Sequence, residues 1–243
     1  MLLFDFIDSY LIYITVVMSA LFVIYSIFTK TAFISRNRNK IFLIVSILLI
    51  WTQIARYIGV FFNGEQTWSM WFLNFKIDPF SIRSHLPFYM CRLSVLVLLY
   101  YALTKDKRVQ PFLFFWGATG LAGVIYPNGA IDNIVNLKET FFIDHFLLAV
   151  TPFYLVVYEN YVPKFKDVLK ITGLMALILY VFIPLNGLVD ADYFYLADQS
   201  IFGDLFPGVH SIVFATVHAL VAGVFFSVYY LYFRSKEYHV IKQ

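Results

Sequence analysis

The sequence predicts an all-α membrane bundle of seven transmembrane helices, and three observations carry that prediction. Of the 243 residues, 61% are hydrophobic and 14% are charged, whereas a typical soluble domain has about 45–50% apolar and about 25% charged residues. Seven apolar runs approach the roughly 20 residues that cross a bilayer. Basic residues alternate between the two sides of these runs. The composition excludes a soluble enzyme, a disordered chain and a nucleic-acid binder, and it predicts one domain over residues 1–243.

The seven runs follow one another without a visible internal repeat or linker. Asp5 and Asp8 precede the first run and no basic residue does, so we interpret it as a retained helix and not as a signal peptide. Glycine and proline punctuate the fourth run and make it the weakest, although transmembrane helices tolerate both residues. The predicted spans are Tyr10–Thr29, Ile41–Phe62, Leu86–Thr104, Pro111–Pro127, Phe141–Tyr158, Val168–Leu188 and Val209–Phe233.

The orientation follows from the connections between the runs. Short connections rich in Lys and Arg stay on the cytoplasmic side of a membrane. Such residues gather at 30–40, 105–108 and 164–170 and in the tail from Arg234, whereas four aspartates lie in the connection 189–208. We therefore expect a multi-pass protein of the cell membrane with its N-terminus outside and its C-terminus in the cytoplasm.

Several polar side chains lie at one depth of the predicted bundle. An ionisable residue within a span is costly and is a functional candidate by default. At a rise of about 1.5 Å per residue, Cys91, His145 and Arg56 lie roughly 6–9 Å below the outer ends of three different helices. Asn186 and His210 lie within a turn of the outer ends of two more. This common depth predicts a polar site in the outer leaflet.

The pair of Cys91 and His145 is the candidate chemistry of that site. Cys91 is the one cysteine of the chain, which excludes a disulfide and a cysteine-based zinc site. A thiolate is a nucleophile, and an imidazole within hydrogen-bonding reach can take the proton of the thiol. Either residue alone has an ordinary structural explanation, so the nucleophile hypothesis requires the two to meet. Asp144 points about 100° away from His145, and we expect it to pair with Arg56 or Arg92.

Three short segments carry a family resemblance. Residues 86–94, LPFYMCRLS, look like an LPxxxCxLS segment, and residues 141–145, FFIDH, are similar to a helix with a single histidine. Residues 185–187, LNG, with 192–196, DYFYL, resemble an asparagine followed by an NYxyL segment. These are segments of the YwaF-like bacterial integral membrane proteins, whose eukaryotic relative is transmembrane protein 164, a phospholipid acyltransferase. The resemblance runs from the second predicted helix to the last.

This resemblance implies an acyltransferase that works without coenzyme A or another cofactor. In the eukaryotic relative, a cysteine takes an acyl chain from a phospholipid as a thioester, and a histidine assists. By resemblance, Cys91 is the nucleophile and His145 is the base, with membrane phospholipids or lipoprotein acyl chains as partners. Phe146 stands where the pattern has Gly, Asp192 stands where it has Asn, and Arg92 is an unusual neighbour for the cysteine. These departures bear on the choice of substrate more than on the chemistry.

Further roles complete the hypothesis. Asn186 or Tyr193 could donate a hydrogen bond to the developing oxyanion or orient the site. Arg56, Arg83 and Arg92 could hold a headgroup phosphate. The thioester would pass to a second lipid, an amine or water, so a lipid ester hydrolase is included.

Two alternatives stay open at this point. The first is a non-catalytic lipid-binding or sensor protein that holds an amphiphile in the same polar layer. The second is a zinc hydrolase built from His145, His210 and His218, although the last two lie roughly 12 Å apart along one helix. We expect no metal.

Overall fold

The computed structural model describes residues 22–27, 29–30, 32–63, 66–70, 73–77, 89–125, 138–189, 191, 193–196 and 210–240. A helical stretch covers residues 22–27. The labelled elements are α2 (Ala32–Asn63), β1 (Gln66–Met70), β2 (Leu73–Ile77), α4 (Met90–Thr104), η1 (Lys107–Val109), α5 (Gln110–Ile125), α7 (Lys138–Tyr158), α8 (Phe165–Val189), η2 (Tyr193–Tyr195) and α9 (Ser211–Val240).

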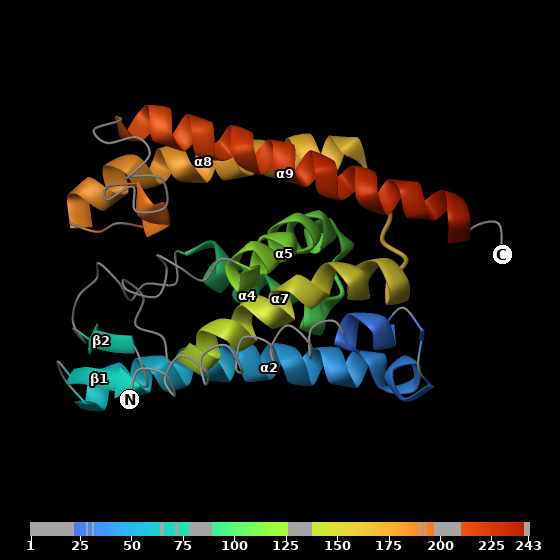
Figure 1. Ribbon diagram of the computed structural model, residues 1–243, viewed down its shortest axis with the longest axis horizontal. Coiled ribbons are helices and arrows are strands. Elements are labelled where there is room, and N and C mark those ends of the chain that lie inside the picture. Colours follow the sequence, from blue (N-terminus) through green and yellow to red (C-terminus); the bar gives the residue numbers. More distant parts are fainter. Residues whose placement is uncertain are drawn as a thin grey trace, which may run out of the picture.

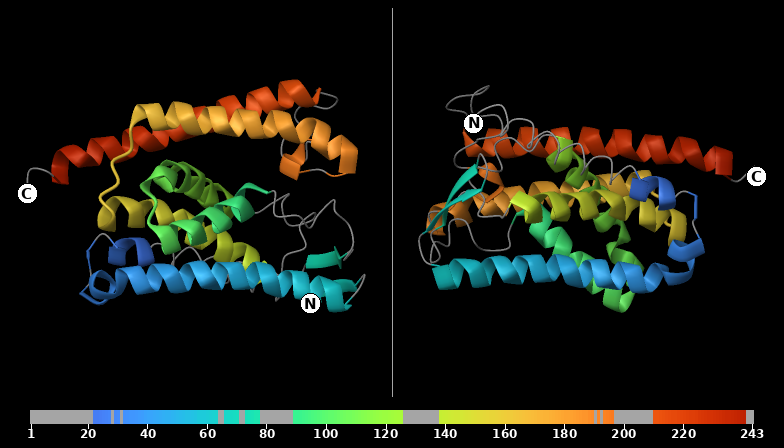
Figure 2. Two further views of the ribbon diagram at one scale, coloured as in Figure 1. Left: turned by 180° about the vertical axis from the view of Figure 1, so that it is seen from behind. Right: turned by 60° about the horizontal axis from the view of Figure 1, so that its bottom comes forward.

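The helices form three layers (Figure 1). Helix α2 lies on one side, α4, α5 and α7 form the middle layer, and α8 and α9 lie side by side on the other side (Figure 2). The main contacts join α5 to α7, α8 to α9, α2 to α4 and α4 to α5. The middle layer therefore has helices on both sides.

The helical class of the prediction is confirmed. Helices α2, α4, α5, α7, α8 and α9 overlap the second to seventh predicted runs, and the first run, Tyr10–Thr29, lies largely outside the described residues. By length and composition, α8 and the stretch Ser211–Arg234 of α9 can cross a membrane, whereas Met90–Thr104 and Asp144–Tyr158 are shorter apolar helices. The number of spans and their orientation stay predictions.

A two-stranded hairpin adds to the helical fold in the connection between the second and third predicted spans. Strands β1 and β2 pair antiparallel, with Gln66 opposite Ile77 and Met70 opposite Leu73. In the second strand, Leu73, Phe75 and Ile77 alternate with Asn74 and Lys76, which is the period of two of a β-strand. The helix–hairpin order places the strands directly after α2.

Helix α2 has one face toward protein and one apolar face left open. Phe42, Ser46 and Leu49 are buried and spaced four and three residues apart, as a helical stripe requires. The open face is also apolar, and helices α8 and α9 expose similar residues. Exposed apolar side chains of α2 include Ile44, Ile47, Leu48, Trp51 and Ile54. Large exposed apolar faces are typical of a surface that meets lipid.

Helix α5 is the buried centre of the bundle. All residues from 113 to 118 are buried. Two glycines of this helix touch the backbone of α7: a Cβ added at Gly117 would lie 2.9 Å from the carbonyl oxygen of Leu148, and one at Gly120 would lie 2.6 Å from that of His145. Small residues allow this close approach of two helix backbones. The glycines that weakened the prediction of this span are thus its packing surface.

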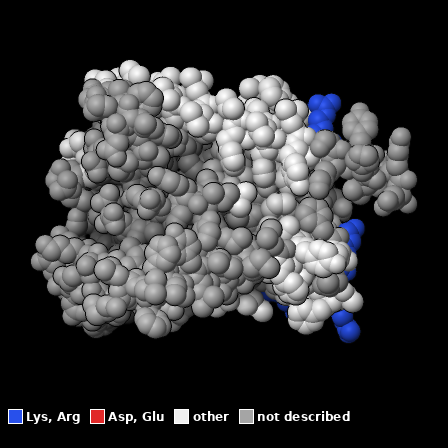
Figure 3. Space-filling model, viewed as in Figure 1, with Lys and Arg blue, Asp and Glu red and all other residues white. Residues whose placement is uncertain are grey.

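Lys and Arg side chains gather at one end of the molecule (Figure 3). This is the end where α2 begins, α7 ends and α9 ends (Figure 1). Acidic residues whose side chains are described at these helix ends are Asp106, Glu159 and Asp167. The basic residues whose side chains are described there are Lys30, Arg36, Arg38, Lys40, Lys105, Lys107, Arg108, Lys164, Lys166, Lys170 and Arg234. A basic end of this kind agrees with the predicted cytoplasmic side.

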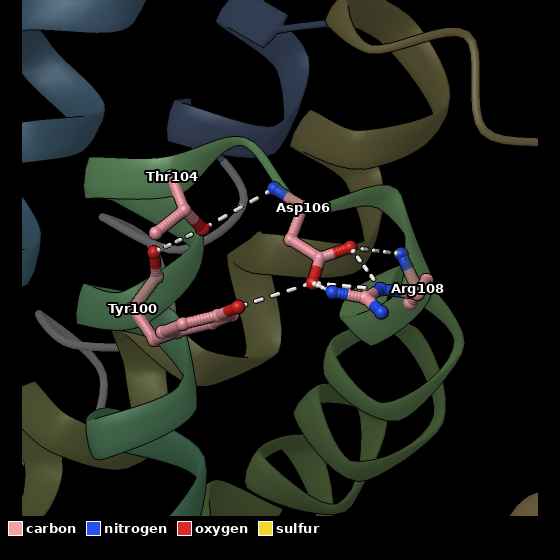
Figure 4. A network of polar contacts seen from close by, with 4 residues as sticks. All are labelled: Tyr100, Thr104, Asp106 and Arg108. Atoms are coloured by element: carbon pink, nitrogen blue, oxygen red, sulfur yellow. Dashed lines mark hydrogen bonds and ion pairs between the residues drawn. The ribbon is translucent and has the colours of Figure 1, made fainter.

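Asp106 fixes the short link between α4 and α5 (Figure 4). Its Oδ1 accepts hydrogen bonds from the backbone N–H of Arg108 at 3.0 Å and from Nε of the same residue at 2.9 Å. Its Oδ2 accepts from the hydroxyl of Tyr100 at 3.1 Å. The backbone N–H of Asp106 donates to the hydroxyl of Thr104. These bonds cap η1, which leads directly into α5.

Lys105 joins three helices at the same end. It ends α4 in a left-handed conformation with φ 55°, and its backbone N–H donates to the carbonyl of Tyr101. Its ammonium lies 3.1 Å from Oε1 of Glu159. The same ammonium lies 5.1 Å from the ring centre of Phe42, 5.2 Å from that of Tyr101 and 6.0 Å from that of Tyr154. An ammonium over aromatic faces is attracted by them, so this contact ties α2, α4 and α7 together.

The Lys105–Glu159 pair predicts a pH dependence of stability. Burial raises the pKa of Glu159, but the hydrogen bond and the charge of Lys105 outweigh it and lower the pKa below its ordinary value of 4.5. A lowered folded-state pKa stabilises the protein above the unfolded-state pKa, and this stabilisation is lost as the pH falls through the folded-state pKa. Solvent screens the partly exposed pair, so we expect a loss of about 1 kcal/mol.

Thermal unfolding in detergent at several pH values measures this loss. The unfolding temperature of the wild-type protein should fall below pH 5 more steeply than that of Glu159→Gln, which has no carboxylate to protonate. Parallel curves for the two proteins would contradict the expectation.

Candidate functional site

The site begins at the first turn of α4. Tyr89 precedes the helix in an extended conformation, and the helix starts at Met90, so Cys91 is its second residue. The predicted start at Leu86 is therefore wrong, and Cys91 is not the sixth residue of its helix. The positive end of a helix dipole acts over the first turn and favours negative charge there. Because Cys91 lies in the first turn of α4, the helix dipole acts on its partly buried thiol.

His145 of α7 meets Cys91. The thiol and the imidazole form a side-chain hydrogen bond, and their charges interact. His145 is buried at 9% exposure. The third and fifth predicted spans therefore carry two side chains that touch, which is the geometry that the nucleophile hypothesis requires.

Asp144 neighbours His145 on α7 and is buried at 4% exposure. The hydroxyl of Thr52 lies 3.0 Å from its Oδ1, and Nε2 of Gln53 donates to its Oδ2. The Thr52 hydroxyl also lies 2.7 Å from the carbonyl oxygen of Leu49. The carboxylate thus has partners from α2 that the sequence did not indicate. The side chain of Arg56 lies outside the described residues, and its pairing with Asp144 stays a prediction.

Arg92 follows the cysteine and is buried at 3% exposure. Its guanidinium carbon lies 4.9 Å from the ring centre of Tyr89. The charge of Arg92 acts on the thiol of Cys91. The ring of Tyr89 meets the ring of Tyr193 edge-on at 5.4 Å. Arg92 is therefore packed within the protein beside the thiol, and Tyr89 connects it to η2.

Asn186 holds the turn that carries Tyr193. Its Nδ2 donates to the carbonyl of Tyr193 at 2.9 Å, and its Oδ1 accepts from the backbone N–H of Tyr193 at 3.0 Å. Phe194 adopts a left-handed conformation with φ 61°, which is strained for a residue with a side chain. Both ends of the Asn186 amide are thus engaged with backbone. This geometry favours the orienting role of Asn186 over that of a free oxyanion donor.

Four predicted residues remain. Arg83 lies outside the described residues, as does the side chain of Arg56. Nδ1 of His210 accepts from the backbone N–H of Ile212 at the start of α9. Nδ1 of His218 is buried without a hydrogen-bond partner. Among the described residues, no three His, Cys, Asp or Glu side chains form a group that could hold a metal ion. The zinc alternative built from His145, His210 and His218 is therefore wrong.

Sequence reasoning missed Thr52, Gln53 and Tyr89. The first two form an uncharged polar pair inside the apolar run Ile41–Phe62. That pair is a weak signal, since hydroxyl and amide groups are common in membrane helices. The role of Thr52 and Gln53 becomes clear only from the structure, in which Asp144 lies opposite them.

These features define a helical membrane protein with a thiol–imidazole pair and a buried carboxylate between apolar helices. The chain belongs to the TMEM164 family, whose model matches residues 6–230. Among curated proteins and among solved structures, no significant similarity to this chain was found. Family membership is compatible with an acyltransferase-like role in a membrane.

Proposed function

We propose that this protein is a membrane-embedded acyltransferase that moves an acyl chain between lipids through a thioester on Cys91. The hydrogen bond between Cys91 and His145 is the observation that carries the proposal. It occurs in a chain of the TMEM164 family, and the resemblance of residues 86–94 and 141–145 implies the same two residues. The donor would be a phospholipid or a lipoprotein acyl chain, and coenzyme A would not take part.

The first half of the reaction forms the thioester. His145 takes the thiol proton while the sulfur of Cys91 attacks the ester carbonyl, and a tetrahedral oxyanion forms. When the ester C–O bond breaks, the alcohol leaves with the proton that His145 returns. The helix N-terminus at Met90 and the buried charge of Arg92 favour negative charge near the sulfur.

The second half transfers the acyl chain. A hydroxyl or amine of an acceptor attacks the thioester and loses its proton to His145, which protonates the departing thiolate of Cys91. Asn186 positions Tyr193 beside Tyr89. In the proposal, Arg56, Arg83 and Arg92 hold the headgroup phosphate, Tyr193 donates to the oxyanion, and Asn186 orients Tyr193.

The proposal includes the location of the site. Seven spans, an outer N-terminus and a cytoplasmic C-terminus put Cys91 in the outer leaflet of a cell membrane. The gathering of basic residues at the opposite end supports this orientation (Figure 3). By the three quoted segments, the YwaF-like bacterial proteins are the proposed branch of the family.

Mass spectrometry of the acyl-enzyme tests the proposal. The purified protein, incubated with phospholipid vesicles and digested, should carry a fatty acyl group on the peptide with Cys91, and neutral hydroxylamine should remove it. His145→Ala should lower the amount of acyl group, since its thiol lacks the base. Absence of any acyl group on Cys91 in the wild-type protein would contradict the proposal and favour a non-catalytic lipid-binding or sensor protein.

A further inference from the structure

We infer that Asp144, anchored by Thr52 and Gln53 of α2, is a positioning residue that aims His145 at Cys91. The inference rests on the proposed function. It assigns no contact with substrate to Asp144. The residue acts through its neighbour on α7.

The anchors fix the rotation of α7. Asp144 and His145 are consecutive, so their side chains leave the helix about 100° apart. One carboxylate oxygen is held by Thr52 and the other by Gln53, both on α2. His145 meets Cys91 on α4. Two faces of α7 therefore make contacts with two different helices, α2 and α4. A rotation of α7 about its axis that broke one contact would also break the other.

The packing of α5 fixes the remaining freedom of this turn. The carbonyl oxygen of His145 would lie 2.6 Å from a Cβ added at Gly120, so the two backbones are in close contact. This contact keeps the helical turn that carries His145 against α5. The motion that remains is rotation of α7 about its own axis, and the contacts of Asp144 with α2 restrict that rotation.

The orientation of the Gln53 amide supports a dedicated contact. Its Nε2 donates to Asp144, whereas its Oε1 is buried without a hydrogen-bond partner. A buried unpaired carbonyl is unfavourable. The Gln53 amide thus donates to the carboxylate although its own carbonyl oxygen is left without a donor. A buried carboxylate within an apolar helix is itself costly, and an apolar residue would hold α7 against α2 at a lower cost.

Alkylation of the thiol tests the inference independently of lipid chemistry. The chain has one cysteine, so iodoacetamide consumption by the full-length protein in detergent reports Cys91 alone. The alkylation rate at pH 7 is divided by the rate at high pH. At high pH the thiol ionises without a base, so the rate there measures only the access of iodoacetamide to the sulfur. The variants are Asp144→Ala, Asp144→Asn, His145→Ala and the double variant Asp144→Ala/His145→Ala. Thr151→Ala is the matched control, a buried hydroxyl on the same helix that bonds to the carbonyl of Leu147.

Asp144→Ala should lower the normalised rate about tenfold or more, because a misaimed base loses much of its effect. Asp144→Asn keeps a side-chain acceptor for α2 and should lower the rate less than about threefold, and Thr151→Ala should leave it unchanged. The double variant should react no more slowly than His145→Ala, because the other effect of Asp144 on the thiol is its negative charge, whose loss would not slow the reaction.

Additive losses in the double variant would overturn the inference, as would an equal effect of Thr151→Ala. A normal rate for Asp144→Ala would overturn it too. The acyl-enzyme experiment separates the two proposals. A non-additive cycle without any acyl group on Cys91 would support the positioning role and refute the acyltransferase.

Discussion

Replacement of Cys91 by alanine is expected to abolish acyl transfer between lipids in reconstituted vesicles. The variant has no atom that can carry the acyl chain, so the loss should exceed that of any other substitution in the site. Cys91→Ser should retain little activity because a hydroxyl is a far weaker acid than a thiol. His145→Ala should lower the rate by about 10²–10⁴-fold, the usual contribution of a general base. Transfer of a labelled acyl chain from a phospholipid to a lysolipid measures all three.

Ser94→Ala provides the control on the same helix. Ser94 is buried one turn after Cys91, and its hydroxyl donates to the carbonyl of Met90 within the helix. Its removal should leave transfer within about twofold of wild type, since such local bonds contribute little. Full transfer by Cys91→Ala would show that another group carries the acyl chain.

Gly120→Ala is expected to destabilise the protein by about 2 kcal/mol or more, although alanine is the better helix former. The new Cβ would lie 2.6 Å from the carbonyl oxygen of His145 and 2.9 Å from the backbone nitrogen of Ala149. Both are backbone atoms of α7, so neither can rotate away as a side chain would. Helix α7 would have to move and carry His145 with it. Both the unfolding temperature and the alkylation rate of Cys91 should therefore fall.

Gly173 supplies the matched substitution. It lies on α8, is exposed, and a Cβ added there meets nothing within 4 Å. Gly173→Ala should leave the unfolding temperature unchanged or raise it slightly, because alanine favours the helix by about 0.8–1 kcal/mol. Equal unfolding temperatures for the two variants would show that α5 and α7 tolerate a wider separation.

Apolar run length predicted the later helices closely. The expected spans Val168–Leu188 and Val209–Phe233 lie within or near α8 and α9, since each run is long and uninterrupted. The start of α4 was missed because the apolar run extends back to Leu86, ahead of the first helical turn. The hairpin after α2 was missed because its segment was treated only as a connection between two spans, although residues 73–77 alternate with the period of a strand.

The site was predictable where a residue is unusual for its surroundings. A thiol and an imidazole in apolar runs attract notice one by one, and helical rise placed them at one depth. Their neighbours were not predictable, because a single sequence does not say which face of α2 meets which face of α7. Thr52 and Gln53 gain their role from Asp144 across that contact. For the same reason, the glycines of α5 indicated only a weak transmembrane span, and their packing against α7 could not be predicted.

Lys105, which ends α4, has two successive roles under the proposed topology. While the chain is being threaded into the bilayer, its ammonium counts with its basic neighbours in keeping that connection inside the cell. Once the bundle closes, three rings and one carboxylate contact the same group. The same ammonium therefore serves both steps, and it stays partly accessible to anionic headgroups, with 37% of its side chain exposed.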